Sequence, residues 1–440
     1  MPILFPAALE SVTAPQSEAG MKVLCIIEQC NPLWASVPLV GFNLYKSLRE
    51  LTQVTLVTHG RNRAGLDPVR QGHEIIYIDE SPFIQNYYRL TACLSSMGGV
   101  IWPLKHALAY PAYAQFNRRV LKMFGGPVEQ GSYDLVHALT PILPRYPYAI
   151  VRACQTTPFV LGPVNGGIPY PDGFKEIARR EFSGLNVLRL FSRLLPDYAE
   201  AYKKAACVLA GSSYTRDMIR DMFSLPDNRL MLFPENGIEE DQFHPPENKA
   251  RSELLHLLFV GRLVPYKGAD MLLEALSLLP PEVRGSCLLT IVGDGPERPR
   301  LELLARQLNI AGLVKFSGWV SQQQTPFYYR EADLFCFPSV REFGGAVVLE
   351  AMACGLPCIV VDHGGIAEYT TPETGFKLAP VSRQSVVREL AMRIETLFHD
   401  RELLIRMSGA AVKQSQSFSW PAKAQQIIKI YEQALSRKRM

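Results

Sequence analysis

Residues 338–365 read PSVREFGGAVVLEAMACGLPCIVVDHGG and directly follow the apolar run Leu334–Phe337. A short apolar run of this kind predicts a buried strand. The pair Gly344-Gly345 should then open a helix over about 346–354, because the Gly and Pro that follow are typical helix-ending residues. The next apolar run, 358–361, predicts a second buried strand. The stretch therefore predicts one parallel strand–helix–strand unit.

The glycine turn of this unit leaves backbone N–H groups at the start of a helix, which is a favourable place for a phosphate. Two carboxylates frame it, Glu342 in the preceding loop and Glu350 about a turn and a half into the helix. A carboxylate repels phosphate but accepts hydrogen bonds from hydroxyls, so both are expected to bind a sugar or ribose. The alternative, open at this point, is an ordinary scaffold with a solvated Glu342 and a Glu350 on a helix face.

Two cations follow an earlier strand that belongs to the same predicted sheet. Residues 254–260 predict this strand, Gly261-Arg262 end it, and Lys267 lies just before the next helix. The carboxyl ends of parallel strands share one edge of a sheet, so both cations should point toward the glycine turn. Two cations and a helix N-terminus suit a diphosphate better than a single phosphate.

Strands alternate with helices in two consecutive sets, which a polar, Pro-containing segment separates. This alternation predicts an α/β fold of two Rossmann-like domains, with a ligand cleft between the carboxyl ends of their parallel sheets. The expected organisation is a flexible tail at 1–20, a first domain at 21–235, a linker at 236–253, a second domain at 254–415 and a terminal helix at 416–440.

Composition is that of an ordinary globular protein, with 440 residues, 48% hydrophobic and 20% charged residues and a net charge of +4. No apolar run reaches the roughly 18 residues that a membrane span needs. Nine cysteines without a CxxC pair are expected to be buried thiols in a reducing cytoplasm. Asp362-His363 lacks a nearby third ligand, so neither a metal nor another cofactor is expected.

Residues 81–128 carry five Lys or Arg side chains and no acidic residue, together with many aromatic residues. Basic and aromatic residues in combination can contact a membrane surface or an anionic acceptor. They can equally form helices that pack on a domain and extend their cations into water. Both interpretations stay open.

Three positions in the first domain are candidates for the other side of the cleft. His137 is predicted to end a strand at 133–137, where it could be either a catalytic group or a structural hydrogen-bonding group. Asn165 and Gly166 begin a glycine-rich turn after another predicted strand, at 159–161. This turn would allow the backbone to approach the acceptor or the sugar.

At this point the sequence resembles a known family. The resemblance rests on Gly261-Arg262 with Lys267-Gly268, Val292–Pro296, Gly318–Val320, and Glu342 and Glu350 with seven residues between them. These segments are similar to the family 4 retaining glycosyltransferases of the GT-B fold. Weaker matches in the expected order extend the resemblance from about Lys22 to the C-terminus.

The resemblance implies a nucleoside-diphosphate-sugar donor bound mainly by the second domain. In this family's pattern, Glu342 contacts sugar hydroxyls, Glu350 the ribose, and Arg262 and Lys267 the diphosphate. The backbone of Phe343, Gly344, Gly345 and Ala346 would meet the phosphates or the sugar, and the segment up to Val320 would flank the base. The terminal helix would cross back onto the first domain.

Two departures from the family pattern concern the first domain. Ala35-Ser36 stands where the family usually has a glycine pair that lets the backbone approach the donor. Leu139 stands where many members have a functional His, so either His137 takes that role or no His does. The nucleotide side of the site is therefore better defined than the sugar side, where Ser36 is a candidate.

The predicted function is transfer of a sugar, with retention of configuration, to a glycan or lipid-linked acceptor in cell-surface polysaccharide or glycoconjugate synthesis. The expected location is the cytoplasm, with peripheral contact at the inner face of the membrane and no nucleic-acid partner. Two alternatives are a nucleotide-sugar epimerase of similar architecture and a non-catalytic sugar-nucleotide binder. The departures at Ala35-Ser36 and Leu139 suggest the second alternative.

Overall fold

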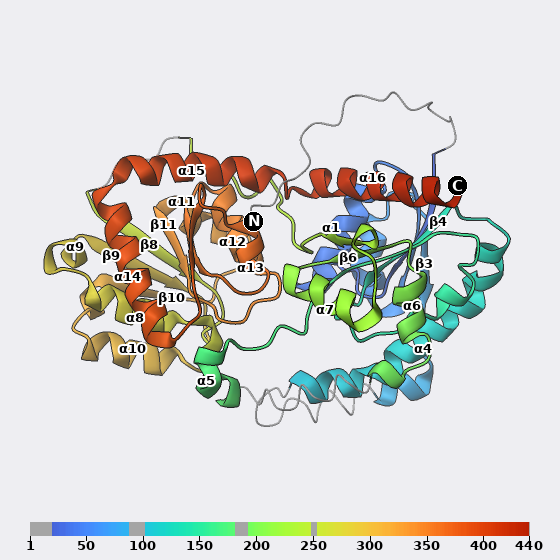
Figure 1. The fold of residues 1–440 in the computed structure, drawn as a ribbon, viewed down its shortest axis with the longest axis horizontal. Helices are drawn as coiled ribbons and strands as arrows, with labels where there is room; N and C mark the ends of the chain where they lie inside the picture. Colours follow the sequence, from blue (N-terminus) through green and yellow to red (C-terminus); the bar gives the residue numbers. More distant parts are fainter. Residues whose placement is uncertain (1–19, 88–101, 181–191, 248–252, 440) are drawn as a thin grey trace.

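The computed structural model describes residues 20–87, 102–180, 192–247 and 253–439. Within these residues the chain forms two parallel sheets, each part of a separate layered domain (Figure 1). The first sheet has the strand order β3-β2-β1-β4-β5-β6-β7. Its strands are β1 (Lys22–Ile27), β2 (Gln53–His59), β3 (Ile75–Ile78), β4 (Leu135–Thr140), β5 (Phe159–Val164), β6 (Cys207–Ala210) and β7 (Leu230–Leu232).

The second sheet has the order β10-β9-β8-β11-β12-β13. Its strands are β8 (Leu255–Val260), β9 (Cys287–Val292), β10 (Val314–Gly318), β11 (Leu334–Phe337), β12 (Cys358–Val361) and β13 (Gly375–Leu378). The strand order reverses between β1 and β4 in the first sheet and between β8 and β11 in the second. Ligands of open α/β sheets bind beside such reversals, at the carboxyl ends of the strands.

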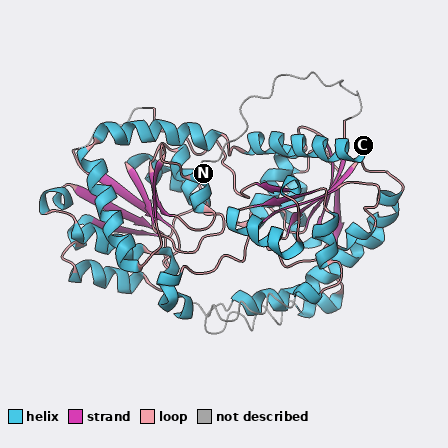
Figure 2. Cartoon of the chain, viewed as in Figure 1, coloured by secondary structure: helices cyan, strands magenta, loops and turns pink. Residues whose placement is uncertain are grey.

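Helices cover both faces of each sheet (Figure 2). In the first domain they are α1 (Val37–Leu48), α2 (Arg63–Leu66), α4 (Trp102–Glu129), α6 (Tyr198–Lys204) and α7 (Ser213–Phe223). Helix α5 (Lys175–Arg180) precedes the linker in sequence but lies beside the second domain, where Ile177 packs against that core (Figure 1). In the second they are α8 (Ala269–Leu278), α9 (Pro281–Gly285), α10 (Arg298–Gln307), α11 (Thr325–Glu331), α12 (Ala346–Ala353), α13 (Ile366–Tyr369), α14 (Arg383–His399) and α15 (Arg401–Gln416). Parallel strands buried on both faces explain the continuous apolar runs in the sequence.

The last helix, α16 (Trp420–Arg439), leaves the second domain and lies along the first (Figure 1). Its apolar face is buried in the same core cluster as β1 and α1, through Trp420, Ile427 and Tyr431. The expected return of the terminal helix to the first domain is confirmed. This helix stabilises the first domain with residues that are distant in sequence.

The predicted strand at 133–137 is wrong in its position. β4 begins at Leu135 and continues to Thr140, so His137 lies inside the strand and not at its end. All six residues of β4 are buried, including His137 and Thr140. Polar residues can occupy such a strand when hydrogen bonds satisfy them, and the hydropathy pattern alone did not reveal this.

Candidate active site

The centre of the candidate site is an ion pair between Lys267 and Glu342. Lys267 ends the short 3-10 turn Pro265–Lys267 that follows β8, and Glu342 lies in the loop after β11. Because β8 and β11 are neighbours at the strand-order reversal, their loops meet there. The two side chains are only 14% and 15% exposed, so the pair is largely shielded from water. The Lys267 Nζ also lies 5.0 Å from the centre of the Phe337 ring.

The predicted glycine turn lies directly beside this pair, and α12 begins at Ala346. Gly345 has φ 59° and ψ 57°, a left-handed conformation that glycine adopts without strain. A Cβ at Gly345 would lie 2.3 Å from Ile366 Cγ2 and 2.9 Å from Glu342 Cγ. The turn therefore requires glycine for both its conformation and its packing, and it orients the start of α12 toward the ion pair.

Glu350 lies on α12, where its carboxylate accepts a hydrogen bond of 2.8 Å from the Tyr329 hydroxyl. Burial raises the pKa of Glu350 to about 7, although the bond from Tyr329 opposes this shift. A half-buried carboxylate with remaining acceptor capacity can bind a hydroxyl group. The structure thus places Glu350 on the same helix as the glycine turn, as the sequence predicts.

The remaining predicted donor residues lie at neighbouring strand ends. Gly261 directly follows β8, and a Cβ there would contact the Phe337 ring at 3.3 Å. Arg262 is exposed next to it. Val320 follows β10 and is half-buried, whereas its neighbour Trp319 is 76% exposed. Because the strands are parallel, all these positions share the cleft edge of the sheet.

Asn165 is brought directly to the Gly344-Gly345 turn from the other domain. Its Nδ2 donates a hydrogen bond of 2.9 Å to the carbonyl oxygen of Phe343. The loop that follows makes two more contacts with the second domain, in which Ile168 O accepts from Arg341 Nε at 3.3 Å and Pro169 O lies 2.8 Å from His363 Nε2. Gly166, with φ 154°, allows this loop to turn close to Pro144. The structure thus shows Asn165 contacting the residue directly before the Gly344-Gly345 turn.

His137 is not at the cleft edge, which corrects its assignment as a strand-end catalytic candidate. Its imidazole is completely buried, with Nδ1 2.6 Å from the Tyr431 hydroxyl and Nε2 2.7 Å from the Gly162 carbonyl oxygen. Burial lowers the pKa of His137 to about 4. Both ring nitrogens are occupied, so His137 joins β4 to α16 and β5 as a structural residue.

Ser36 precedes α1 at the first-domain side of the cleft and is exposed. Its φ of 70° and ψ of −136° fall in a region that residues other than glycine rarely adopt. The serine therefore adopts a backbone conformation that favours glycine, the residue that the resemblance led us to expect. The loop can keep its path without glycine, at a cost in strain.

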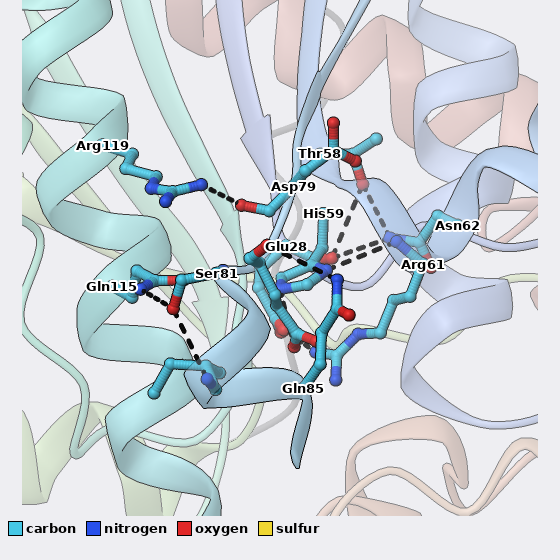
Figure 3. A network of polar contacts seen from close by, with 12 residues as sticks. Glu28, Thr58, His59, Arg61, Asn62, Asp79, Ser81, Gln85, Gln115 and Arg119 are labelled. Carbon is cyan, nitrogen blue, oxygen red and sulfur yellow. Dashed lines mark hydrogen bonds and ion pairs between the residues drawn. The ribbon is translucent and has the colours of Figure 1, made fainter. Parts of the chain in front are cut away.

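A polar network at the carboxyl ends of β1, β2 and β3 was not predicted from the sequence (Figure 3). Glu28, directly after β1, forms an ion pair with Arg61. His59 ends β2, and its Nε2 lies 3.1 Å from Glu80 Oε1. Burial lowers the pKa of His59 to about 3, so this imidazole is neutral at pH 7. Asn62 Nδ2 donates to the Glu28 carbonyl oxygen at 2.9 Å. Glu28, His59 and Glu80 lie at the ends of three different strands, so sequence spacing did not predict these contacts.

Metal ligands do not gather in the described part of the chain, where no group of three His, Cys, Asp or Glu side chains could hold an ion. Asp362 and His363 contact different partners. Asp362 lies 3.6 Å from Lys377 Nζ, and His363 contacts Pro169 O. Each residue has a structural partner of its own.

Among the described aromatic residues of the 81–128 segment, three pack inward, whereas Phe83 is 75% exposed. Tyr113, Phe116 and Phe124 of α4 are buried in the first-domain core, whereas Arg118 and Lys122 of the same helix are exposed. This arrangement favours a helix packed on the domain with its cations in water. Residues 88–101 lie outside the described part. Among the described helices, none has the length and apolarity to cross a membrane.

Comparisons with known proteins support the same family as the residues of the candidate site do. Residues 240–414 match the family model described as glycosyl transferases group 1. A D-inositol 3-phosphate glycosyltransferase of Frankia alni is 30% identical over 351 residues, which cover 75% of this chain and 82% of that protein. The enzyme of the same name from Streptomyces scabiei is 28% identical over 345 residues, 73% and 72% of the two chains.

Solved structures show the same fold. A glycosyltransferase from Rickettsia africae superposes with a TM-score of 0.63 at 17% identity, over 94% of this chain and 99% of that one. Anabaena HepE, solved in complex with UDP, superposes with a TM-score of 0.61 at 20% identity, over 94% and 100%. These proteins support the predicted GT-B fold, and the named transferases do not favour the epimerase alternative. The chain therefore belongs to the group 1 glycosyl transferase family and is an enzyme that transfers a sugar from a nucleoside-diphosphate sugar to an acceptor.

Proposed function

We propose that the enzyme binds its donor diphosphate between Lys267, Arg262 and the start of α12. The observation that supports this is the Lys267–Glu342 pair beside the Gly344-Gly345 turn, at the strand-order reversal of the second sheet. Glu342 would bind the sugar hydroxyls and Glu350 the ribose, because carboxylates accept hydrogen bonds from hydroxyl groups. The backbone of Phe343 to Ala346 would face the phosphates, and Val320 the base.

We propose that transfer retains the anomeric configuration by attack on the same face. The bond between the anomeric carbon and the diphosphate oxygen breaks, and the acceptor oxygen forms a bond on the face that the diphosphate leaves. The acceptor proton moves to the leaving phosphate oxygen. Lys267, Arg262 and the helix N-terminus would stabilise the negative charge that develops on this oxygen, without a metal ion. The chain's main contribution is positioning and charge stabilisation.

We place the acceptor at the strand-order reversal of the first sheet, between Glu28 after β1 and Thr140 at the end of β4. The Gln29 N–H donates to Thr140 Oγ1 at 3.0 Å, which joins these two strand ends. Two nearby carboxylates are paired with cations, Glu28 with Arg61 and Asp79 with Arg63. These paired charges and a neutral His59 suit the hydroxyls of a glycan or glycolipid. This assignment agrees with a role in surface glycan synthesis.

We also propose peripheral contact with an anionic membrane through α4. Arg118, Lys122 and Met123 are exposed on this helix, and Met123 is 52% exposed. Sedimentation with anionic liposomes at low and high salt tests this contact. Binding that disappears at high salt supports it, because salt screens surface charges. Absence of liposome binding at low salt would contradict the proposed membrane contact.

A thermal-shift panel of nucleotide sugars tests the donor assignment, because only a ligand of the folded state raises the melting temperature. The selected donor is then incubated alone and with candidate glycan acceptors, and the product anomer is determined by NMR. Transfer with retained configuration is the expected result. An isomerised donor without acceptor would indicate the epimerase, and binding without transfer or hydrolysis would indicate the non-catalytic binder.

A further inference from the structure

We propose that Asn165 and Glu235 are positioning residues, which set the direction of the Gly344 N–H in the donor turn from the opposite domain. This inference rests on the proposed donor site and goes beyond it, because neither side chain belongs to the donor-binding domain. Asn165 follows β5, and Glu235 lies between β7 and the linker.

The Asn165 amide uses all its hydrogen-bonding capacity. Its Nδ2 donates to Glu235 Oε2 at 2.8 Å and to Phe343 O at 2.9 Å. Its Oδ1 accepts from Ser212 Oγ at 3.0 Å and from Thr215 Oγ1 at 2.9 Å. The side chain is 1% exposed. A buried amide with every donor and acceptor satisfied has a single orientation, and here the network fixes it.

Glu235 determines which way this amide faces. Both of its carboxylate oxygens face the same Asn165 Nδ2, at 3.1 Å from Oε1 and 2.8 Å from Oε2. Burial raises the pKa of Glu235, and the hydrogen bond from Asn165 opposes this shift. Carboxylate oxygens that accept from Asn165 select its NH₂ end and leave the second N–H for Phe343 O. The carboxylate fits tightly between two turns. A Cβ on Gly344 would lie 2.4 Å from Oε1, and a Cβ on Gly211 would lie 2.4 Å from Oε2. Glu235 therefore contacts both the β6–α7 turn and the donor turn.

The consequence for the donor follows from the geometry of one peptide group. The Phe343 carbonyl and the Gly344 N–H belong to the same planar trans peptide, so they point in opposite directions. A hydrogen bond that holds the carbonyl toward Asn165 directs the N–H away from the first domain. A peptide group next to a glycine rotates easily, and Gly344 directly follows the Phe343 carbonyl. The hydrogen bond from Asn165 to this carbonyl restricts the rotation.

The arrangement also couples donor binding to the approach of the two domains. The Asn165–Phe343 bond joins the first domain to the donor turn, and it exists only when the domains are in this relative position. Separation of the domains would release the Phe343 peptide. A donor that binds the oriented N–H would in turn favour the closed arrangement, because the two equilibria are linked.

The test compares Asn165→Asp, Glu235→Gln and the double variant N165D/E235Q. In Asn165→Asp two carboxylates face each other and Phe343 O loses its donor, so both stability and nucleotide affinity should fall. In the double variant the amide and the carboxylate exchange places, so the contact between them is restored. The carboxylate now at position 165 still has no N–H for Phe343 O. We expect the melting temperature to recover toward wild type, while affinity for UDP and GDP stays at least about tenfold weaker.

Calorimetric titration with UDP and with GDP is the primary measurement, since the nucleotide alone would occupy the turn. Recovery of nucleotide affinity together with stability in the double variant would overturn the positioning role. Ser213→Ala is the matched control, because it removes an interdomain hydrogen bond of 2.6 Å to Glu368 that does not involve the donor turn. We expect unchanged nucleotide affinity in this control, and a comparable loss there would also contradict the proposal. A wild-type protein that binds neither nucleotide would instead contradict the proposed donor site.

Discussion

The ammonium group of Lys267 and the carboxylate of Glu342 form an ion pair between the loops after β8 and β11. The two residues are 75 positions apart, yet the strand-order reversal makes their loops neighbours. A shielded pair of this kind is costly to separate into single charges. A bound diphosphate would offer Lys267 a second anion, and Glu342 would then be available to the sugar hydroxyls.

Lys267→Ala should lower kcat/KM by at least about 100-fold, because it removes a cation from the leaving diphosphate. It should also lower the melting temperature, since Glu342 remains shielded without its partner. Glu342→Ala should lower kcat/KM through the sugar contact. Steady-state kinetics with the donor from the thermal-shift panel checks both variants. Lys46→Ala is the control, because the ion pair between Lys46 and Glu239 is exposed. Unchanged turnover in both Lys267→Ala and Glu342→Ala would show that the site is wrongly assigned.

Glu350 should make both stability and donor binding depend on pH. Burial raises the pKa of its carboxyl group from 4.5 to about 7 in the folded state. The folded state therefore binds more protons than the unfolded state between these values, and this group's contribution to the free energy of unfolding falls as pH rises from 4.5 to 7. The loss is at most roughly 3 kcal/mol. Glu350→Gln should remove this slope in thermal unfolding measured from about pH 5 to 8.

Donor affinity should show the opposite trend at the same residue. The ionised Glu350 is the better acceptor for a ribose hydroxyl, so affinity should rise as pH passes through about 7. Titration calorimetry with the nucleotide checks this trend, and Glu350→Gln should bind more weakly with a flatter profile. A wild-type affinity that is independent of pH would argue against the ribose contact.

His137→Leu should destabilise the protein by about 2–4 kcal/mol, because the Gly162 carbonyl and the Tyr431 hydroxyl lose a buried partner. The catalytic rate of the folded fraction should stay within about twofold of wild type. Denaturant unfolding and steady-state kinetics below the melting transition separate the two effects. Tyr431→Phe serves as the companion variant on α16. A large loss of kcat with unchanged stability would restore His137 as a catalytic candidate.

Ser36→Gly should stabilise the protein by up to about 1 kcal/mol. Relief of the strained backbone gains about 1–3 kcal/mol, and the greater freedom of glycine in the unfolded chain offsets part of it. Thermal unfolding measures the difference. Ser213→Gly, which places glycine at the first residue of α7, should instead lower the melting temperature. Destabilisation by Ser36→Gly would show that the serine side chain matters more than the strain.

The α/β class, the two sets of strands and the Gly344-Gly345 turn could all be predicted from the amino-acid sequence. Buried parallel strands are continuous apolar runs, and the turn between β11 and α12 depends on glycines that are adjacent in sequence. Lys267 and Glu342 could be assigned to one edge of a sheet because strand direction alone places them there. These features depend on local chemistry and on the parallel order of strands.

The arrangement across the cleft could be learned only from the folded chain. The location of His137 depended on where β4 ends and on Tyr431, which is 294 residues away. Asn165, Glu235 and Phe343 meet because two domains and a linker bring them together, and the network of Glu28, His59 and Glu80 forms at three separate strand ends. Such contacts depend on the relative placement of distant elements, which local periodicity does not encode. The Gly344-Gly345 turn is therefore a local feature of the sequence, whereas its contacts with Asn165 and Glu235 are a property of both domains.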